Sequence, residues 1–333
     1  MYPRPLTFDA PVLDDVLPII DRSRYVTTRV GRISEHAQWM AQEPLSYRPG
    51  AVEFASEDAT LESEVDMSMV IALLNFAFTD FETSTKFTAN YRGRDWSDSE
   101  GLMACLRRAL DDGIPVTSAS YLAEVTVDDL KKVFAGNIEM PMLAERAEIL
   151  NDASKVLLDR YDGSWTNFLD DCGPLLFDGG KGAVERLVTE FPRFDDAVDY
   201  HGHRARIYKL AQLTFWGLHG QFGATGRFAY QDIERLTAFA DYIVPLALRV
   251  MDILEYAPEL ESKLNRGVLL GRDSDEEIEI RAHTIYAIAL LTEEINRRRP
   301  ADDQVIMARV DGRLWTSFHA SRWPHHLTIT PMY

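Results

Sequence analysis

One carboxylate stands alone in a long apolar run of this 333-residue chain. Asp241 is the only charged residue between Leu236 and Leu248. Burying an ionised carboxylate without a partner costs several kcal/mol, so Asp241 must be paired, raised in pKa or directed into a polar cleft. Such perturbed groups are candidate catalytic residues. The alternative is a structural aspartate that accepts hydrogen bonds from backbone amides.

A segment shortly upstream supplies cations in a region that otherwise has the composition of a protein core. It contains three basic and two hydrogen-bonding side chains: Arg204, Arg206, Lys209, Tyr208 and Gln212. An ammonium can bind a phosphate monoester as a point charge, which makes Lys209 a candidate phosphate ligand. Salt bridges to the many acidic residues nearby are the alternative.

A second carboxylate lies in an apolar and aromatic setting near the C-terminus. Asp311 stands in the sequence Val310-Asp311-Gly312-Arg313-Leu314-Trp315. An acceptor at this position can read the N–H edge of a guanine-like base, and aromatic residues can stack on the face of that base. Asp311 is therefore a candidate base-binding residue.

Other familiar site patterns give no support for a cofactor or a metal. The sequence lacks the phosphate-loop, dinucleotide-binding, zincin and serine-hydrolase motifs. His201-Gly202-His203 and His325-His326 have metal-like spacing but no accompanying ligand pattern, so we predict neither a metal nor a cofactor. Glu277 and Arg281, four residues apart, are expected to form a structural pair on one helix face.

Charge and cysteine content narrow the class of protein. The formal net charge is −18, with 35 Lys and Arg against 53 Asp and Glu, which disfavours polymeric nucleic acid and anionic membranes as main partners. Two cysteines without a CxxC pairing favour a reducing compartment. With no signal-like apolar segment near Met1 and no run of about 18 apolar residues, we expect a cytoplasmic protein.

Helical periodicity dominates the elements that must position these residues. It predicts helices over residues 64–78, 97–110, 126–134, 143–161, 182–191, 207–218, 241–256, 274–298 and 303–318. Pro245 falls in the first turn of one of them, where proline is tolerated. Strand signals are short, at 87–91, 94–95 and 205–208, with a hairpin around Arg92-Gly93. We expect one compact, mainly α-helical domain over residues 1–333, with two lobes around a cleft.

Several of these motifs together resemble the queuosine salvage proteins, the queuosine 5′-phosphate N-glycosylases. The similar segments run in order along most of the chain: Leu74-Asn75-Phe76, Tyr91-Arg92-Gly93, residues 113–121, residues 207–212, residues 239–245, residues 277–281, Asp311 with Leu314-Trp315, and residues 326–333. The resemblance implies a helical fold similar to the helix-hairpin-helix DNA glycosylases. It also implies hydrolysis of queuosine 5′-phosphate to queuine and ribose 5-phosphate without a metal.

The resemblance also assigns roles to individual positions. Asp241 matches the catalytic aspartate, Phe239 a residue that packs on the queuine base, and Asp311 a base-reading carboxylate. The other expected substrate contacts are Lys209, Tyr208, Tyr242, Gly312 and Thr316. The chain departs from the family pattern at three positions, where the usual Tyr, Asp and Arg are replaced by Gly312, Thr316 and Leu210. These departures concern the contacts to the cyclopentenediol and to the anion.

Three other functions remain compatible with these residues. The first is a base-excision glycosylase acting on nucleic acid, against which the net charge argues. The second is a queuine-binding or carrier protein that uses the same pocket without catalysis. The third is a helical interaction protein whose buried acids are structural.

Overall fold

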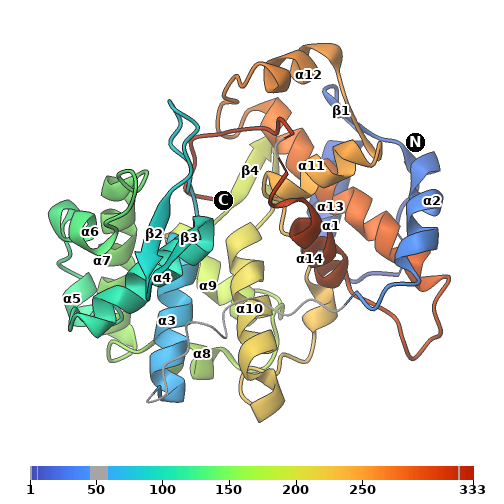
Figure 1. Ribbon diagram of the computed structural model, residues 1–333. Helices are drawn as coiled ribbons and strands as arrows, with labels where there is room; N and C mark the ends of the chain where they lie inside the picture. The colour runs from blue at the N-terminus through green and yellow to red at the C-terminus, as the bar shows by residue number, and fades with distance from the viewer. Residues whose placement is uncertain (1, 6, 46–58, 322) are drawn as a thin grey trace. The chain divides into compact units, whose positions relative to one another are not determined.

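The computed structural model describes residues 2–5, 7–45, 59–321 and 323–333, and most of these residues are helical (Figure 1). The helices in chain order are α1 (Pro11–Ile20), α2 (Val30–Met40), α3 (Leu61–Leu74), α4 (Asp98–Asp111), α5 (Ala119–Leu122), α6 (Val127–Val133), α7 (Leu143–Arg160), α8 (Trp165–Cys172), α9 (Ala183–Glu190), α10 (Lys209–Phe222), α11 (Ile243–Val250), α12 (Pro258–Asn265), α13 (Asp275–Asn296) and α14 (Met307–Phe318). The strands are β1 (Val26–Thr28), β2 (Thr88–Tyr91), β3 (Arg94–Ser97), β4 (Ala197–Tyr200), β5 (His203–Arg206) and β6 (Leu254–Tyr256). The prediction of a mainly α-helical protein is confirmed.

The chain divides into two compact units, and each collects segments that are distant in sequence. The first unit contains the described residues of 1–48, 196–212 and 232–329. The second contains those of 49–195, 213–231 and 330–333. The expectation of one domain with two lobes stays a prediction, as does the similarity to the helix-hairpin-helix glycosylases.

Helix α13 forms the core of the first unit. Helices α1, α2, α11 and α14 pack against it (Figure 1). Buried residues follow one another along almost its whole length, so α13 is a core helix rather than an amphipathic surface helix. Its N-terminus is capped by the hydroxyl of Ser274, which accepts a hydrogen bond from the Glu277 amide at 3.4 Å. The predicted helix over 274–298 is confirmed.

Glu279 fixes the N-terminal segment of the chain on one side of α13. Its fully buried carboxylate accepts hydrogen bonds from the amides of Arg24, Tyr25 and Val26 and from the Tyr200 hydroxyl, at distances of 2.7 to 3.0 Å. These hydrogen bonds satisfy the oxygens of a carboxylate that is buried away from water. Glu279 is therefore a structural residue that anchors the chain before β1.

The short strands of the first unit form two antiparallel pairs. Val26 of β1 lies opposite Tyr256 of β6. In the hairpin of β4 and β5, Tyr200 pairs with His203 across a two-residue turn. Both turn residues have positive φ angles, which is typical of a tight hairpin turn.

The predicted helix over residues 241–256 is only partly correct. Helix α11 ends at Val250, and residues 254–256 form β6 instead. Asp252 between them has a φ of 59°, which interrupts the helical backbone. The apolar periodicity continues into β6 because Leu254 and Tyr256 are buried against the same core. Pro245 lies in the first turn of α11, as predicted.

In the second unit, the buried Arg146 explains why α3 ends at Leu74. Its guanidinium donates to the carbonyl oxygens of Leu74, Phe76 and Ala77. These carbonyls follow an irregular path instead of continuing the predicted helix to residue 78. Of the other predictions in this unit, the hairpin around Arg92-Gly93 and the helix over 126–134 are confirmed, the latter with a capping box between Thr126 and Asp129.

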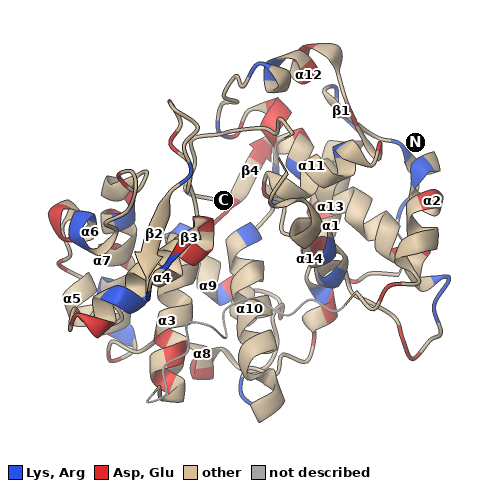
Figure 2. Cartoon of the chain, in the orientation of Figure 1, with Lys and Arg blue, Asp and Glu red and all other residues tan. Residues whose placement is uncertain are grey.

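Charged residues of both signs are interspersed on the surface helices. Figure 2 shows this on α12, where Lys263 pairs with Glu276 of α13 at 2.7 Å. Within the described ranges, every helix is too short or too polar to cross a membrane.

Candidate active site

Asp241 lies in the first unit, two residues before α11 begins at Ile243. Its Oδ1 accepts hydrogen bonds from the amides of Ile243 at 2.7 Å and Val244 at 3.2 Å. The alternative of an aspartate that binds backbone amides is therefore correct for one of the two oxygens. Oδ2 makes no hydrogen bond to any residue that the structure describes. The carboxylate is thus oriented by the helix amides and retains one oxygen for another partner.

The residues before Asp241 form a buried segment without regular secondary structure. The amide of Thr237 donates to Gln212 at 2.9 Å, and the amide of Phe239 donates to Asp311 Oδ2 at 3.0 Å. The carbonyl of Ala240 accepts from Arg281 Nε at 3.0 Å. Because buried backbone groups need partners, these three side chains determine the path of the segment.

Lys209 begins α10 and is buried, with 6% of its surface exposed. Burial lowers the pKa of its ammonium below the ordinary value; the Asp241 carboxylate counteracts this shift. Over the described part of the chain, Nζ has neither a hydrogen bond nor a direct ion pair. An ammonium in this position is poorly compensated and would gain from an anionic or hydrogen-bonding ligand.

Asp311 is buried on α14. Its Oδ2 is bonded to the Phe239 amide, while Oδ1 forms no hydrogen bond with a described residue. Burial raises the pKa of Asp311 well above the ordinary value, and the negative charge of Asp241 raises it further. The amide of Phe239 and the charge of Lys209 act in the opposite direction.

Lys209, Asp241 and Asp311 therefore form a cluster of interacting buried charges. Each influences the protonation of another, since the charge of Asp241 acts on both Lys209 and Asp311. Each also has a polar atom with unused hydrogen-bonding capacity toward the described residues. Because buried polar atoms are normally paired, such a cluster is a candidate site for a polar ligand.

Tyr208 and Phe239 lie next to this cluster in sequence. Tyr208 has a φ of 48°, which is unusual for a bulky side chain and is often found at functional sites. Phe239 is buried and is joined to Asp311 through its amide. The structure thus brings together five of the predicted site residues within one unit.

The three remaining predicted contacts differ in their exposure. Tyr242 is partly exposed and stacks on His325, with ring centroids 4.7 Å apart. Gly312 is buried beside Asp311, whereas Thr316 is exposed on α14. The Thr316 hydroxyl donates to the Gly312 carbonyl at 2.8 Å.

Sequence reasoning missed Asp196, which is buried just before β4. It forms an ion pair with Arg281 and also accepts a hydrogen bond from the Lys209 amide at 3.1 Å. The predicted pair of Arg281 with Glu277 is confirmed, at the longer distance of 3.4 Å. The sequence indicates only that Arg281 needs an acidic partner. It does not identify Asp196 as that partner.

The histidines of the His201-Gly202-His203 motif bind protein groups. His201 pairs with Asp275 at 3.1 Å, and His203 is hydrogen-bonded to the Asp15 carbonyl at 2.7 Å. Groups of three or more potential metal ligands do not occur in the portion of the chain that is described.

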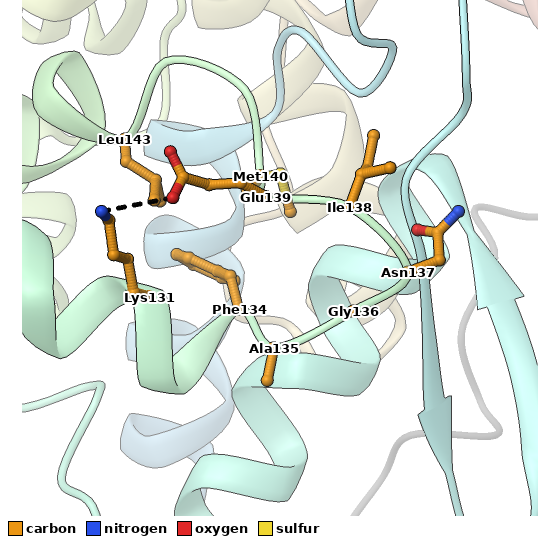
Figure 3. Close-up of a pocket in the computed structure, with 9 residues that line it drawn as sticks. All are labelled: Lys131, Phe134, Ala135, Gly136, Asn137, Ile138, Glu139, Met140 and Leu143. Carbon is orange, nitrogen blue, oxygen red and sulfur yellow. Dashed lines mark ion pairs between the residues drawn. The ribbon is translucent and has the colours of Figure 1, made fainter.

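A separate hollow of about 330 Å³ lies in the second unit, and Figure 3 shows its lining. Lys131 and Glu139 form an ion pair across it at 3.3 Å, and the buried side chains of Phe134 and Met140 form part of its wall. The lining contains one carboxylate, which is already paired, and none of the predicted site residues. The hollow therefore lacks the charge cluster seen in the first unit.

Fold and site define a mainly helical protein with a buried cluster of ionisable groups, and sequence comparison gives its family. The family model described as queuosine salvage protein matches residues 54–333. This chain belongs to that family.

Relatives named queuosine 5′-phosphate N-glycosylase/hydrolase are similar over most of the chain. A protein of Sphaerobacter thermophilus is 36% identical over 275 residues, 82% of each chain. A protein of Mus musculus is 31% identical over 236 residues, 70% of this chain and 69% of its own. A protein of Schizosaccharomyces pombe is 29% identical over 303 residues, 86% of each chain.

Proposed function

We propose that this protein hydrolyses the N-glycosidic bond of queuosine 5′-phosphate and releases queuine and ribose 5-phosphate. The buried cluster of Lys209, Asp241 and Asp311 is the observation that supports this function most strongly. Its two carboxylates and one ammonium suit a substrate that has a hydrogen-bonding base, a sugar that becomes cationic and a phosphate. The names of the relatives agree with this substrate.

Asp241 is the proposed catalytic residue. When the bond between the base and C1′ breaks, positive charge develops on the sugar and negative charge on the base. The Oδ2 atom of Asp241 can stabilise that cation, attack it, or activate the water that completes hydrolysis. Hydrogen bonds from the α11 amides to Oδ1 hold the carboxylate in a fixed orientation for each of these roles.

Asp311 and Phe239 are the proposed base-binding residues. The Asp311 carboxylate accepts hydrogen bonds from the N1–H and 2-amino groups of the deazaguanine, and Phe239 covers one face of the ring. Burial raises the pKa of Asp311 in the absence of these donors. Because hydrogen bonds to the charged form lower a carboxyl pKa, binding of the base favours ionised Asp311.

Lys209 has two candidate roles. It can bind the 5′-phosphate, or it can interact electrostatically with the Asp241 carboxylate while the phosphate binds elsewhere. Tyr208, Tyr242, Gly312 and Thr316 are proposed to complete the substrate contacts. The exposed position of Thr316 favours a contact near the entrance of the site.

We also propose that the fold is related to the helix-hairpin-helix DNA glycosylases and that the protein acts in the cytoplasm on a free nucleotide. The net charge of −18 supports a small substrate rather than nucleic acid. A gel-shift assay with labelled duplex at moderate salt tests this point. Stable binding of the duplex would favour the base-excision alternative.

Incubation with queuosine 5′-phosphate, followed by chromatography of the free base, tests the proposed activity. We expect stoichiometric queuine and ribose 5-phosphate, and slower release from the nucleoside because the phosphate contributes binding energy. Tight binding of queuine without any release of base would instead identify a carrier protein.

A further inference from the structure

We propose that Asp196 and Arg281 are positioning residues that hold the Lys209 and Asp241 segments in their reactive arrangement. This inference rests on the proposed function and adds two residues to it. Neither side chain is assigned to the substrate. Both side chains act instead through hydrogen bonds to the backbone beside Asp241 and Lys209, the residues that are assigned to the substrate.

Arg281 connects α13 to the segment that carries Asp241. Its Nε donates to the carbonyl of Ala240, the residue directly before Asp241, at 3.0 Å. The other two guanidinium nitrogens donate to Asp196, from Nη1 to Oδ1 at 2.9 Å and from Nη2 to Oδ2 at 2.5 Å. A planar guanidinium fixes the directions of all three hydrogen bonds at once, so Ala240 and Asp196 are held in one geometry.

Asp196 connects the same guanidinium to the segment that carries Lys209. Its Oδ2 accepts from the Lys209 amide at 3.1 Å, and its carbonyl accepts from the amides of Ile207 and Tyr208, each at 3.0 Å. Tyr208 has the positive φ angle described above, which persists only where surrounding contacts enforce it. Asp196 supplies those contacts with both its side chain and its backbone.

The burial of this pair indicates that it does more than stabilise the fold. Arg281 is 1% exposed and Asp196 is 4% exposed. A buried ion pair contributes little net stability compared with apolar residues of the same volume. The pair does fix the orientation of the groups bonded to it. Here these are the backbone segments that carry the proposed catalytic carboxylate of Asp241 and the proposed binding ammonium of Lys209. Misplacement of a reactive group by about 1 Å can cost about a hundredfold in rate.

Arg281→Lys tests the inference, with Glu279→Gln as the matched control. Lysine keeps the positive charge opposite Asp196 but cannot reproduce the three directed hydrogen bonds. Glu279 is equally buried on the same helix, and its hydrogen bonds come from the amides of residues 24–26 and from the Tyr200 hydroxyl. We expect kcat to fall about tenfold or more in Arg281→Lys with KM changed less than about threefold. Glu279→Gln should lower Tm while leaving kcat within about twofold of wild type.

A double variant shows whether Arg281 acts through Asp241. In single-turnover assays of the Asp241→Asn background, adding Arg281→Lys should lower the residual rate by less than about threefold, because the group that it positions is already disabled. A full tenfold further loss would contradict the proposal that Arg281 acts through Asp241. So would a kcat for Arg281→Lys no lower than that of Glu279→Gln.

Asp196→Asn provides an independent variant should Arg281→Lys fail to fold. The asparagine preserves the shape of the side chain and an acceptor for the Lys209 amide. We expect the same tenfold loss of kcat relative to Glu279→Gln. Equal kcat values in Asp196→Asn and Glu279→Gln would overturn the inference. Absence of queuine release by the wild-type protein would refute the proposed function itself. An active wild type with an unimpaired Arg281→Lys refutes only the positioning role.

Discussion

Replacing Asp241 by asparagine removes the charge proposed to meet the sugar cation while preserving the local fold. The asparagine carbonyl can accept the same two hydrogen bonds from the amides of Ile243 and Val244. Asparagine and aspartate are about equally effective at the start of a helix. The remaining loss is the attraction of the carboxylate to the positive end of α11, about 0.3–1 kcal/mol. We therefore expect Tm to fall by only a few degrees.

The expected effect on the reaction is much larger. Two unit charges 3.5 Å apart interact by about 5 kcal/mol at an effective dielectric constant of about 20. The sugar bears only part of a positive charge in the transition state, so about 3–4 kcal/mol is a consistent value for the charge of Asp241. That corresponds to a loss of kcat of about a hundred- to thousandfold, as for removal of one group that stabilises transition-state charge.

The assay measures kcat for queuine release, with thermal unfolding recorded on the same samples. Asp252→Asn is the matched control, because Asp252 follows α11 at the surface and pairs with Arg29 outside the charge cluster. We expect this control to retain full activity. Queuine release by Asp241→Asn at a rate within about fivefold of wild type, with the fold intact, would refute the catalytic role of Asp241.

Three further predictions concern binding and stability. If Lys209 binds the phosphate, Lys209→Ala should reduce the ratio of the rates with nucleotide and nucleoside substrates by about ten- to hundredfold. The control variant Lys263→Ala should leave this ratio unchanged. An unchanged ratio in Lys209→Ala would mean that the phosphate binds elsewhere. Asp311→Asn should raise KM about ten- to hundredfold with a smaller change in kcat, measured by steady-state kinetics; a loss confined to kcat would contradict base recognition. Burial lowers the pKa of His283 and of His326 to about 3. Below about pH 6.5 the unfolded chain therefore binds more protons than the folded protein. The contribution of these histidines to the free energy of unfolding is fully present above that pH and decreases as the pH falls toward 3. Urea denaturation should show about 2 kcal/mol lost per histidine between pH 7 and pH 5, and equal stability at both values would exclude this contribution.

Local signals in the sequence were sufficient to predict most helices. The cap at Ser274 and the apolar run that follows it predict α13, and the cap at Thr126 predicts α6. Arg92-Gly93 similarly predicts the turn between β2 and β3. These features depend on residues a few positions apart, so periodicity and capping chemistry are enough to find them.

The parts that sequence reasoning missed depend on distant partners. Residues 236–240 are apolar enough for a strand or a helix, yet they are irregular because Gln212, Arg281 and Asp311 bind their backbone groups. The pairing of Arg281 with Asp196 joins positions 85 residues apart, whereas spacing along the helix favoured Glu277. No local pattern distinguishes these partners from other residues of the same charge.

Asp241 shows how a site residue can be predicted while its surroundings are not. A lone carboxylate in an apolar run indicated a group with special contacts, and the family resemblance indicated its role. The capping of the α11 amides by Oδ1 follows only from where that helix begins. The split between a bound and an available oxygen is therefore a structural finding.

A structure of the Asp241→Asn variant with queuosine 5′-phosphate tests the proposed mechanism most directly. We predict that the side-chain atom replacing Oδ2 lies within about 3.5 Å of the ribose C1′, the separation of groups poised to react. A complex in which the ribose lies outside contact with residue 241, or in which both terminal atoms of that side chain face the α11 amides, would contradict it.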